Sequence, residues 1–153
     1  MATFDFSLFD CGFAFGSVTY IDRYPGDEQN ARIVVSVTIA GGHTTPMIVD
    51  TATPWCILDP EIAEALGLMA DSYAPSRRLT IRGTPYQGML VRVPMTIQPT
   101  NGGQLAAEAT FFIPTLEPGD VWSHPNFLGL DGFLNHIRFA VDAQENTFYF
   151  GRP

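Results

Sequence analysis

The feature that most limits the fold of this chain is a run of alternating apolar and polar residues. In the segment "ARIVVSVTIA" (residues 31–40), every second side chain from Ile33 to Ile39 is apolar. Successive side chains of a strand point to opposite faces, so this spacing predicts a strand with one buried face. The glycine pair that begins at Gly41 supplies a hairpin turn before the apolar stretch "TTPMIVD". The pattern therefore predicts two paired strands that lead to Asp50.

Further strand signals follow along the chain. The segment "RRLTIRGTPYQGMLVRVPMTI" has strand-like runs on both sides of a tip rich in Gly and Pro, residues 83–88, which predicts a long hairpin that can cover a cleft. The segment "AAEATFFIP" predicts another strand, and the last hairpin is expected to have arms at residues 137–141 and 147–150. Since turn residues are frequent and helical periodicity is scarce, we expect a mostly-β chain.

The segment "LDPEIAEALGL" predicts one short helix. Asp59 can cap its N-terminus, Pro60 suits its first position and Gly67 suits its end. Its apolar face is expected to consist of Ile62, Ala65 and Leu66. A brief helical turn is also expected near residues 132–136.

The composition fits one soluble domain. The chain has 153 residues, of which 46% are hydrophobic and 16% are charged, and domains typically contain about 100–200 residues. Its formal charge of −8 repels phosphate backbones and anionic membrane surfaces on average. No apolar stretch of the sequence approaches the ~18 residues that a membrane span needs. We therefore expect neither nucleic acid nor a membrane as a partner.

The cysteines and the N-terminal segment indicate a reducing compartment. Cys11 and Cys56 lie far apart without a C-x-x-C pattern, so free thiols are expected rather than a disulfide or a zinc site. The segment "MATFDFSLFDCGF" carries Asp5 and Asp10 where a signal peptide has basic residues. We therefore expect a cytoplasmic protein.

Several kinds of catalytic site have no support in the sequence. His43, His124 and His136 share no ligand-like spacing, so no metal site is predicted. No Ser–His–Asp or Cys–His order comes with a nucleophile elbow, and no Gly-rich loop has a phosphate-binding form. We expect no cofactor.

The aspartate at the end of the buried strand has two interpretations. Asp50 is followed at once by the sequence Thr-Ala-Thr-Pro. An aspartate in such a place often only forms a turn, in which its side chain caps local amides. In that case the chain is a purely structural β-domain, and replacing Asp50 changes only its stability. In the other interpretation, the carboxylate carries chemistry.

Two motifs about eighty residues apart favour the second interpretation. They are "IVDTAT" and "LGLDGFL", and the flap-like hairpin lies between them. This order resembles the retropepsin-like aspartic proteases, the single-domain class that includes retroviral proteases, and the resemblance covers about residues 32–150. It implies a mostly-β, single-domain acid-protease barrel with one or two short helices and a flap hairpin. Residues 31–153 are then the protease domain, and residues 1–30 are an N-terminal elaboration of it.

The resemblance implies an aspartic endopeptidase that works as a homodimer. In this family, two close carboxylates share one proton and activate a water to hydrolyse a peptide bond. Each chain supplies one motif, so Asp50 of each subunit is the implied catalytic residue at the two-fold axis. Thr51 is the residue that hydrogen-bonds across the axis, and Ala52 stands where most members have Gly. Retroviral members pair through strands at both chain ends.

The resemblance also implies an extended peptide or protein substrate that lies between the flap and the carboxylates. Apolar pockets favour hydrophobic residues beside the bond that is cut. The residues expected to contact substrate are Ile57, Ile81, Gly83, Thr84, Tyr86 and Leu128. The alternative is a catalytically silent retropepsin-fold module that binds peptides or acts as a scaffold, and a stable monomer favours this alternative.

Two other aspartates have simpler interpretations. Asp131 in "LGLDG" resembles a second catalytic aspartate, but its place just before a short helical turn favours an N-cap. Asp142 is expected to form the turn of the last hairpin.

Overall fold

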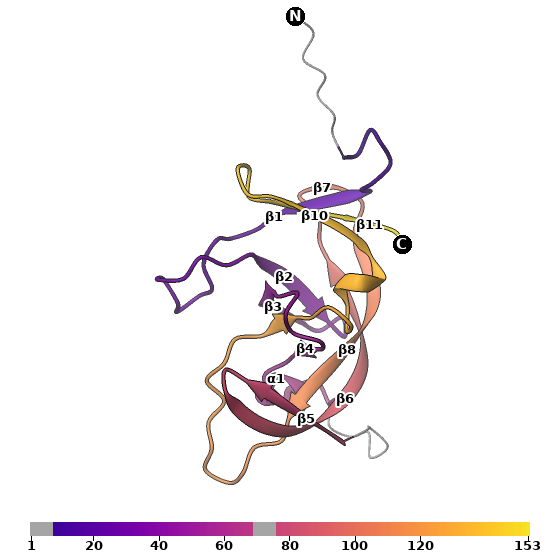
Figure 1. The fold of residues 1–153 in the computed structure, drawn as a ribbon. Helices are drawn as coiled ribbons and strands as arrows, with labels where there is room; N and C mark the ends of the chain where they lie inside the picture. Colours follow the sequence, from indigo (N-terminus) through magenta and orange to yellow (C-terminus); the bar gives the residue numbers. More distant parts are fainter. Residues whose placement is uncertain (1–7, 69–75) are drawn as a thin grey trace, which may run out of the picture.

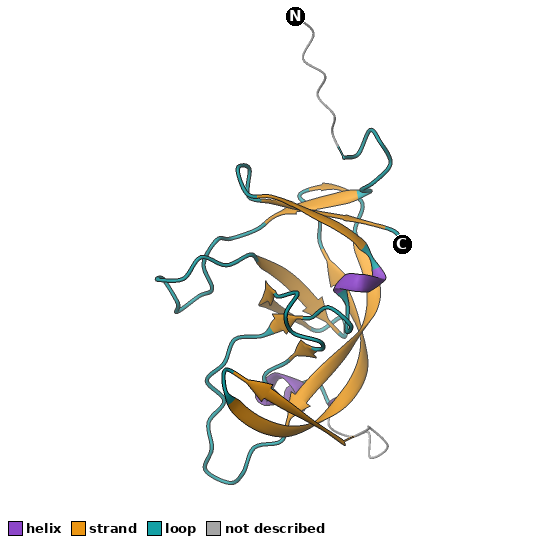
Figure 2. Ribbon diagram, viewed as in Figure 1, coloured by secondary structure: helices purple, strands orange, loops and turns teal. Residues whose placement is uncertain are grey.

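The computed structural model describes residues 8–68 and 76–153, and this part of the chain is mostly β with one short α-helix (Figures 1 and 2). The strands are β1 (Gly16–Thr19), β2 (Val34–Ile39), β3 (His43–Val49), β4 (Cys56–Ile57), β5 (Ser76–Ile81), β6 (Thr84–Ile97), β7 (Asn101–Gly102), β8 (Leu105–Pro114), β9 (Phe127–Leu128), β10 (Arg138–Asp142) and β11 (Thr147–Gly151). The helical elements are α1 (Pro60–Ala65) and the 3-10 helix η2 (Leu134–His136).

Six strands close into a barrel. Their hydrogen-bonded order is β2-β3-β9-β4-β8-β6, and β6 pairs again with β2 through Thr38 opposite Thr96 and Ile39 opposite Met95. The pairs β3–β9 and β4–β8 are parallel, whereas the other pairs of the ring are antiparallel. This arrangement confirms the predicted mostly-β barrel.

The predicted alternation in β2 is present and builds the core. Val35, Val37 and Ile39 are fully buried in the main cluster of the barrel, and Ile33 packs against that cluster from just before the strand. Val34 faces the other way but is also buried, in a smaller apolar cluster with Ile48, Ile57, Ile81, Phe112 and Phe127. The second face of the strand is therefore covered at Val34 but open at Ser36, and alternation alone did not predict the cover at Val34.

A second sheet contains both ends of the described chain (Figure 1). Its strand order is β10-β11-β1-β7, so β11 has β10 on one side and β1 on the other. The last hairpin lies close to its predicted arms, and Asp142 forms its turn, since Oδ1 accepts from the amides of Gln144 (3.0 Å) and Glu145 (3.3 Å). The segment before residue 31 thus shares a sheet with the C-terminal strand.

Helix α1 has the predicted ends, and two of the three residues of its predicted face, Ile62 and Leu66, pack against the main core cluster. Asp59 caps it by accepting from the Glu61 amide at 2.8 Å, and Gly67 after its end has a φ of +73°. The predicted face contained Ala65, which is exposed; Ala63 is the fully buried residue. The buried side of this 6-residue helix therefore consists of Ala63, with Ile62 and Leu66 partly buried beside it.

The flap hairpin turns earlier than predicted. Its tip is the two-residue turn Arg82-Gly83, whose φ angles are +50° and +84°, and Ile81 pairs with Thr84 across it. Two positive φ angles give a turn whose twist matches that of the flanking strands. The predicted tip, residues 83–88, was too long, because Thr84 to Gly88 already belong to strand β6.

The helical turn predicted near residues 132–136 is present as η2, but Asp131 is not its N-cap. Phe133 occupies the cap position without a side-chain bond. The Asp131 carboxylate instead accepts from the Asn135 side chain at 3.3 Å. No helix of the described residues has the length and apolarity needed to cross a membrane.

Gly88 gives a test of the packing between β6 and β8. A Cβ at this position would meet the Ile113 carbonyl oxygen and lie 2.6 Å from a ring carbon of Phe112. We expect Gly88→Ala to lower the free energy of unfolding by about 2 kcal/mol, since overpacked cores typically lose about 1–3 kcal/mol. Urea denaturation measures this.

The matched control is Gly42→Ala. Gly42 is exposed, and its nearest contact would be a Leu66 methyl group at 3.4 Å. This variant should stay within about 0.5 kcal/mol of the wild type. Equal urea midpoints for the two variants would contradict the packing described above.

Candidate active site

Asp50 leaves the barrel where β3 runs parallel to the short strand β9. The Asp50 amide donates to the Leu128 carbonyl at 3.0 Å, and the preceding Val49 amide donates to the Ile33 carbonyl at 2.8 Å. The last residue of β3 and the aspartate after it are thus each hydrogen-bonded to another segment of the chain. These two hydrogen bonds fix the position of the backbone that carries the aspartate.

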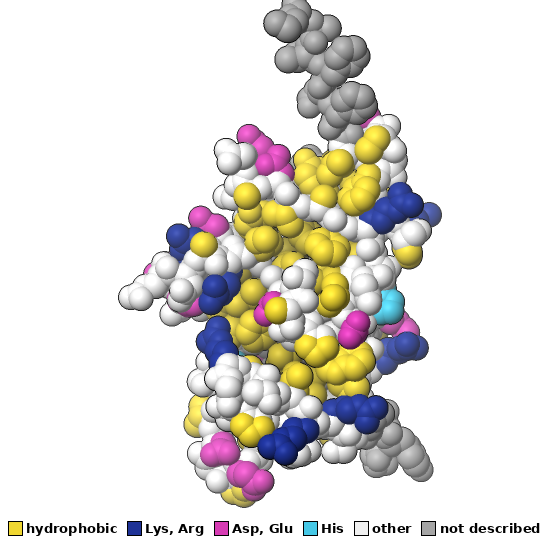
Figure 3. Space-filling model, viewed as in Figure 1, with side chains coloured by type: hydrophobic (Ala, Val, Ile, Leu, Met, Phe, Trp, Pro, Cys, Tyr) yellow, Lys and Arg dark blue, Asp and Glu magenta, His cyan; other side chains and the backbone are white. Residues whose placement is uncertain are grey.

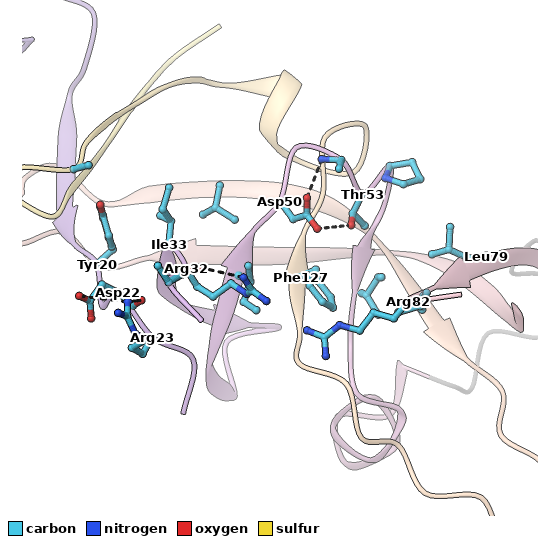
Figure 4. A pocket seen from close by; sticks show the side chains of 18 of the residues that line it. Tyr20, Asp22, Arg23, Arg32, Ile33, Asp50, Thr53, Leu79, Arg82 and Phe127 are labelled. Carbon is cyan, nitrogen blue, oxygen red and sulfur yellow. Dashed lines mark hydrogen bonds and ion pairs between the residues drawn. The ribbon is translucent and has the colours of Figure 1, made fainter. Parts of the chain in front are cut away.

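The Asp50 carboxylate is oriented by its own loop (Figure 4). Oδ1 accepts from the Ala52 amide at 2.9 Å, and Oδ2 accepts from the Thr53 hydroxyl at 3.0 Å. A carboxylate has about four lone-pair sites. Two sites therefore remain for a water, a substrate or another carboxylic acid.

The late motif "LGLDGFL" holds the Asp50 loop by backbone contact. The amides of Leu130 and Gly132 donate to the carbonyls of Thr53 (2.7 Å) and Pro54 (2.9 Å). A Cβ on Gly129 would meet the Trp55 carbonyl, and one on Gly132 would lie 2.6 Å from a backbone oxygen of β8. Only glycine permits this approach, which gives the two glycines of the late motif a physical reason.

A cavity of about 800 Å³ opens beside the carboxylate. Asp50, Ala52 and Thr53 lie on its wall, and the flap strand β5 contributes Leu79 to Ile81. Its other lining residues are Tyr20, Asp22, Arg23, Ala31, Arg32, Ile33, Ile48, Val49, Pro54, Ile57, Arg82, Phe127, Ala143 and Asn146. Figure 3 shows this face as hollowed and largely apolar, with basic side chains at its border.

The residues predicted to contact substrate do not all lie at this cavity. Ile57 and Ile81 line it together with Asp50. Leu128 is fully buried and offers only its carbonyl to the Asp50 amide. Gly83 and Thr84 are exposed at the hairpin tip, outside the lining.

Thr51 is exposed at the outer end of the Asp50 loop and does not line the cavity. Its side chain is therefore accessible to solvent.

Tyr86 belongs to an aromatic cluster that joins the flap to the segment after β8. Its hydroxyl lies 2.9 Å from His124 Nε2, and its ring packs edge-on against Trp122 at 5.2 Å. The Trp122 and His124 rings are 4.9 Å apart. Burial lowers the pKa of His124, and the positive charge of Arg82 lowers it further. Both effects favour the neutral form of the His124 ring.

The sequence did not predict the arginines of the cavity. Arg23 and Arg32 come from the segment around the boundary between the N-terminal elaboration and the proposed domain, which carried no motif. Arg82 precedes Gly83, which was predicted to contact substrate, and this was the one sequence signal that could have indicated Arg82. Their meeting depends on the tertiary fold.

Cys56 lies beneath the Asp50 loop and is chemically silent. Burial raises the pKa of its thiol to about 12, while a backbone hydrogen bond from Gly129 works against that rise. Since the thiolate is the nucleophilic form, this thiol is not a nucleophile near neutral pH. Within residues 8–68 and 76–153, no group of three or more His, Cys, Asp or Glu side chains has the arrangement of a metal site.

The fold is that of the retropepsin-like aspartic proteases. No family model and no curated protein sequence matches the chain. The structure is similar to the crystal structure of a retropepsin-like aspartic protease from Rickettsia conorii, with a TM-score of 0.54 and 13% identity over 87% of this chain and 97% of that chain. It is also similar to the retroviral protease-like domain of Ddi1 from Leishmania major, with a TM-score of 0.48 and 17% identity over 80% of this chain and 94% of that one. The first similarity confirms the retropepsin-like barrel expected from the two motifs.

The aromatic cluster gives a pH prediction. Because folding lowers the pKa of His124 from its ordinary value of 6.5, the folded state favours the neutral ring. The stabilisation should be fully present above pH 6.5 and be lost as pH falls through the folded-state pKa. NMR titration of the His124 ring should give a midpoint below 6.5.

The control for this titration is His124→Gln, which assigns the resonance and removes the titrating group. In urea denaturation, the stability advantage of the wild type over this variant should shrink between pH 7.5 and pH 5 (about one unit or more either side of an ordinary histidine pKa). A His124 midpoint at or above its ordinary value would refute the prediction.

Proposed function

We propose that this protein is an aspartic endopeptidase that acts as a homodimer, with Asp50 of each subunit as the catalytic residue. The observation that carries the proposal is the position of Asp50. It follows strand β3 in a retropepsin-like barrel, and its oriented carboxylate lies on the wall of a large cavity.

The proposed chemistry needs two carboxylates with opposite roles. When two Asp50 side chains lie close together they share one proton, since two like charges at short range do not both ionise readily. The ionised carboxylate takes a proton from a water, whose oxygen attacks the carbonyl carbon of the peptide. The protonated one gives its proton to the carbonyl oxygen. These two steps form a tetrahedral intermediate. When its C–N bond breaks, the carboxylic acid that took the proton from the water gives it to the departing amine.

The lining of the cavity supports an extended peptide substrate with hydrophobic side chains. Ile57, Ile81 and Phe127 present apolar surface next to Asp50. The flap hairpin contributes part of the cavity wall, from Leu79 to Arg82. Enclosing a peptide there would exclude water from the reacting groups.

The proposed dimer must differ from that of retroviral proteases. Strand β11 is paired on both sides within its own subunit, so a partner's terminal strand has no edge of β11 to join. The surface that remains suited to bring two Asp50 residues together is the Asp50 loop itself, where Thr51 and Ala52 are exposed. We therefore place the two-fold axis at this loop.

A silent peptide-binding module is the second candidate. It is favoured by Ala52, which stands where most members of the family have glycine, and by the bonds that occupy both Asp50 oxygens within the loop. Such a module would bind an extended peptide in the same cavity and leave it intact.

The first prediction separates the two candidates. Asp50→Asn should keep the fold but lose peptide cleavage by about 1000-fold or more, because the amide cannot exchange the proton. A diverse peptide mixture, incubated at several pH values from about 4 to 7 and read by mass spectrometry, measures this.

Asp131→Asn is the matched control for that variant. Asp131 is exposed and does not line the cavity, so its replacement should leave cleavage unchanged. If the wild type and Asp50→Asn both stay folded and neither cuts any peptide, the endopeptidase proposal fails.

The second prediction tests the shared site. Adding an equal amount of Asp50→Asn protein to the wild type should remove about half of the cleavage activity after subunit exchange, because mixed dimers have one ionisable carboxylate. Activity per milligram should also rise with protein concentration. An active wild type that is insensitive to both changes would mean that one subunit suffices.

A further inference from the structure

The cavity concentrates positive charge in an acidic protein. The formal charge of the chain is −8, and all eight of its basic residues are arginines. Three of them, Arg23, Arg32 and Arg82, line the cavity that contains Asp50. The local charge is therefore opposite in sign to that of the whole molecule.

Arg23 is already neutralised by its own segment. Its guanidinium donates to the backbone carbonyls of Asp22 (2.7 Å) and Glu28 (3.2 Å), and it lies 3.7 Å from the Asp22 carboxylate. These contacts fix the loop before β2. Asp22, the other acidic residue of the lining besides Asp50, is thus already paired.

Arg32 and Arg82 have no carboxylate at ion-pair distance within residues 8–68 and 76–153. Arg32 donates to the neighbouring Ala31 carbonyl at 3.2 Å, and no hydrogen bond from the Arg82 side chain forms with the described part of the chain. The carboxylate of Asp50 accepts from its own loop instead. Both guanidinium groups therefore keep most of their donors free.

The two free arginines face a common space (Figure 4). Their side chains extend into the cavity from opposite sides, with the Phe127 ring between them. Like charges that point toward one another repel, and a carboxylate placed between them would remove that repulsion. Arg82 also occupies a turn position with a φ of +50°, where glycine or asparagine fits with less strain.

We infer that the cavity binds an extended peptide segment through an acidic side chain, Glu or Asp, whose carboxylate is held between Arg32 and Arg82. Guanidinium groups offer paired donors that match the two oxygens of a carboxylate. Phe127 supplies apolar surface for the methylene part of that side chain. This inference rests on the proposed peptide-binding function and names its substrate class: peptides with an acidic residue close to hydrophobic ones.

Binding to the Asp50→Asn variant tests this without depending on cleavage. The probes are fluorescent peptides with blocked ends, taken from a mixture of hydrophobic sequences, in matched forms that carry Glu or Gln at one position. We expect the Glu form to bind about 10-fold tighter at low salt, as one charge-assisted contact predicts. The net charge of the protein alone predicts the opposite order, so the sign of the difference decides.

Arginine variants locate the preference. Adding Arg32→Gln or Arg82→Gln to the Asp50→Asn protein should remove the difference between the Glu and Gln forms while leaving the affinity for the Gln form within about 2-fold. Arg92→Gln is the matched control, because Arg92 lies outside the cavity and is exposed. It should keep the full preference. A further probe is the Gln form with a free C-terminal carboxylate. Its affinity shows whether the arginines bind a terminal carboxylate rather than an acidic side chain.

The outcomes separate this inference from the proposed function. Equal binding of the Glu and Gln forms, a preference that survives both arginine variants, or binding only through the C-terminal carboxylate overturns the inference. If the wild type cleaves peptides without any preference for an acidic residue, the inference is overturned and the endopeptidase proposal stands. Arginine-dependent binding of the Glu form by a protein that never cuts supports the inference and refutes the endopeptidase.

Discussion

The rest of the structure depends on the close backbone contact between the Asp50 loop and the segment from Gly129 to Gly132. Parallel pairing of β3 with β9 brings the two segments together, and the amides of Leu130 and Gly132 then satisfy the carbonyls of the loop. A side chain at Gly129 would meet the loop backbone. Backbone carbonyls after a strand end need hydrogen-bond partners, and this contact supplies them. It thereby fixes the loop whose amide and hydroxyl groups orient the Asp50 carboxylate.

The cavity beside Asp50 combines an apolar wall with two guanidinium groups that form no ion pair within residues 8–68 and 76–153, and in the peptide complex that we propose these would serve different parts of the ligand. Apolar area supplies most of the attraction for a peptide, whereas charged groups at the border select among peptides. The chain is acidic overall, so nonspecific attraction of anions is weak and a carboxylate gains only where Arg32 and Arg82 converge. Local charge thus provides a means of selection that net charge does not.

The terminal sheet explains how a retropepsin-like barrel can hold its ends without a partner. Strand β1 pairs with β11 along its whole length, and β10 covers the other side. The N-terminal segment therefore gives this chain an internal β-sheet that includes its C-terminal strand. In the dimer that we propose, the exposed loop around Thr51 is therefore the contact surface at which two copies of Asp50 would approach each other.

The sequence by itself determined the strand alternation around Val35, the cap at Asp59 and the turn at Asp142, because these depend on local spacing and backbone preference. The retropepsin-like barrel was indicated instead by the resemblance of the two motifs to that family. The flap tip predicted from the sequence, residues 83–88, was wrong, because the turn at Arg82 and Gly83 depends on the register between β5 and β6. Only the tertiary structure decided that Arg32 and Arg82 share a cavity with Asp50, because their meeting depends on barrel closure and on long-range pairing. No local pattern records such contacts.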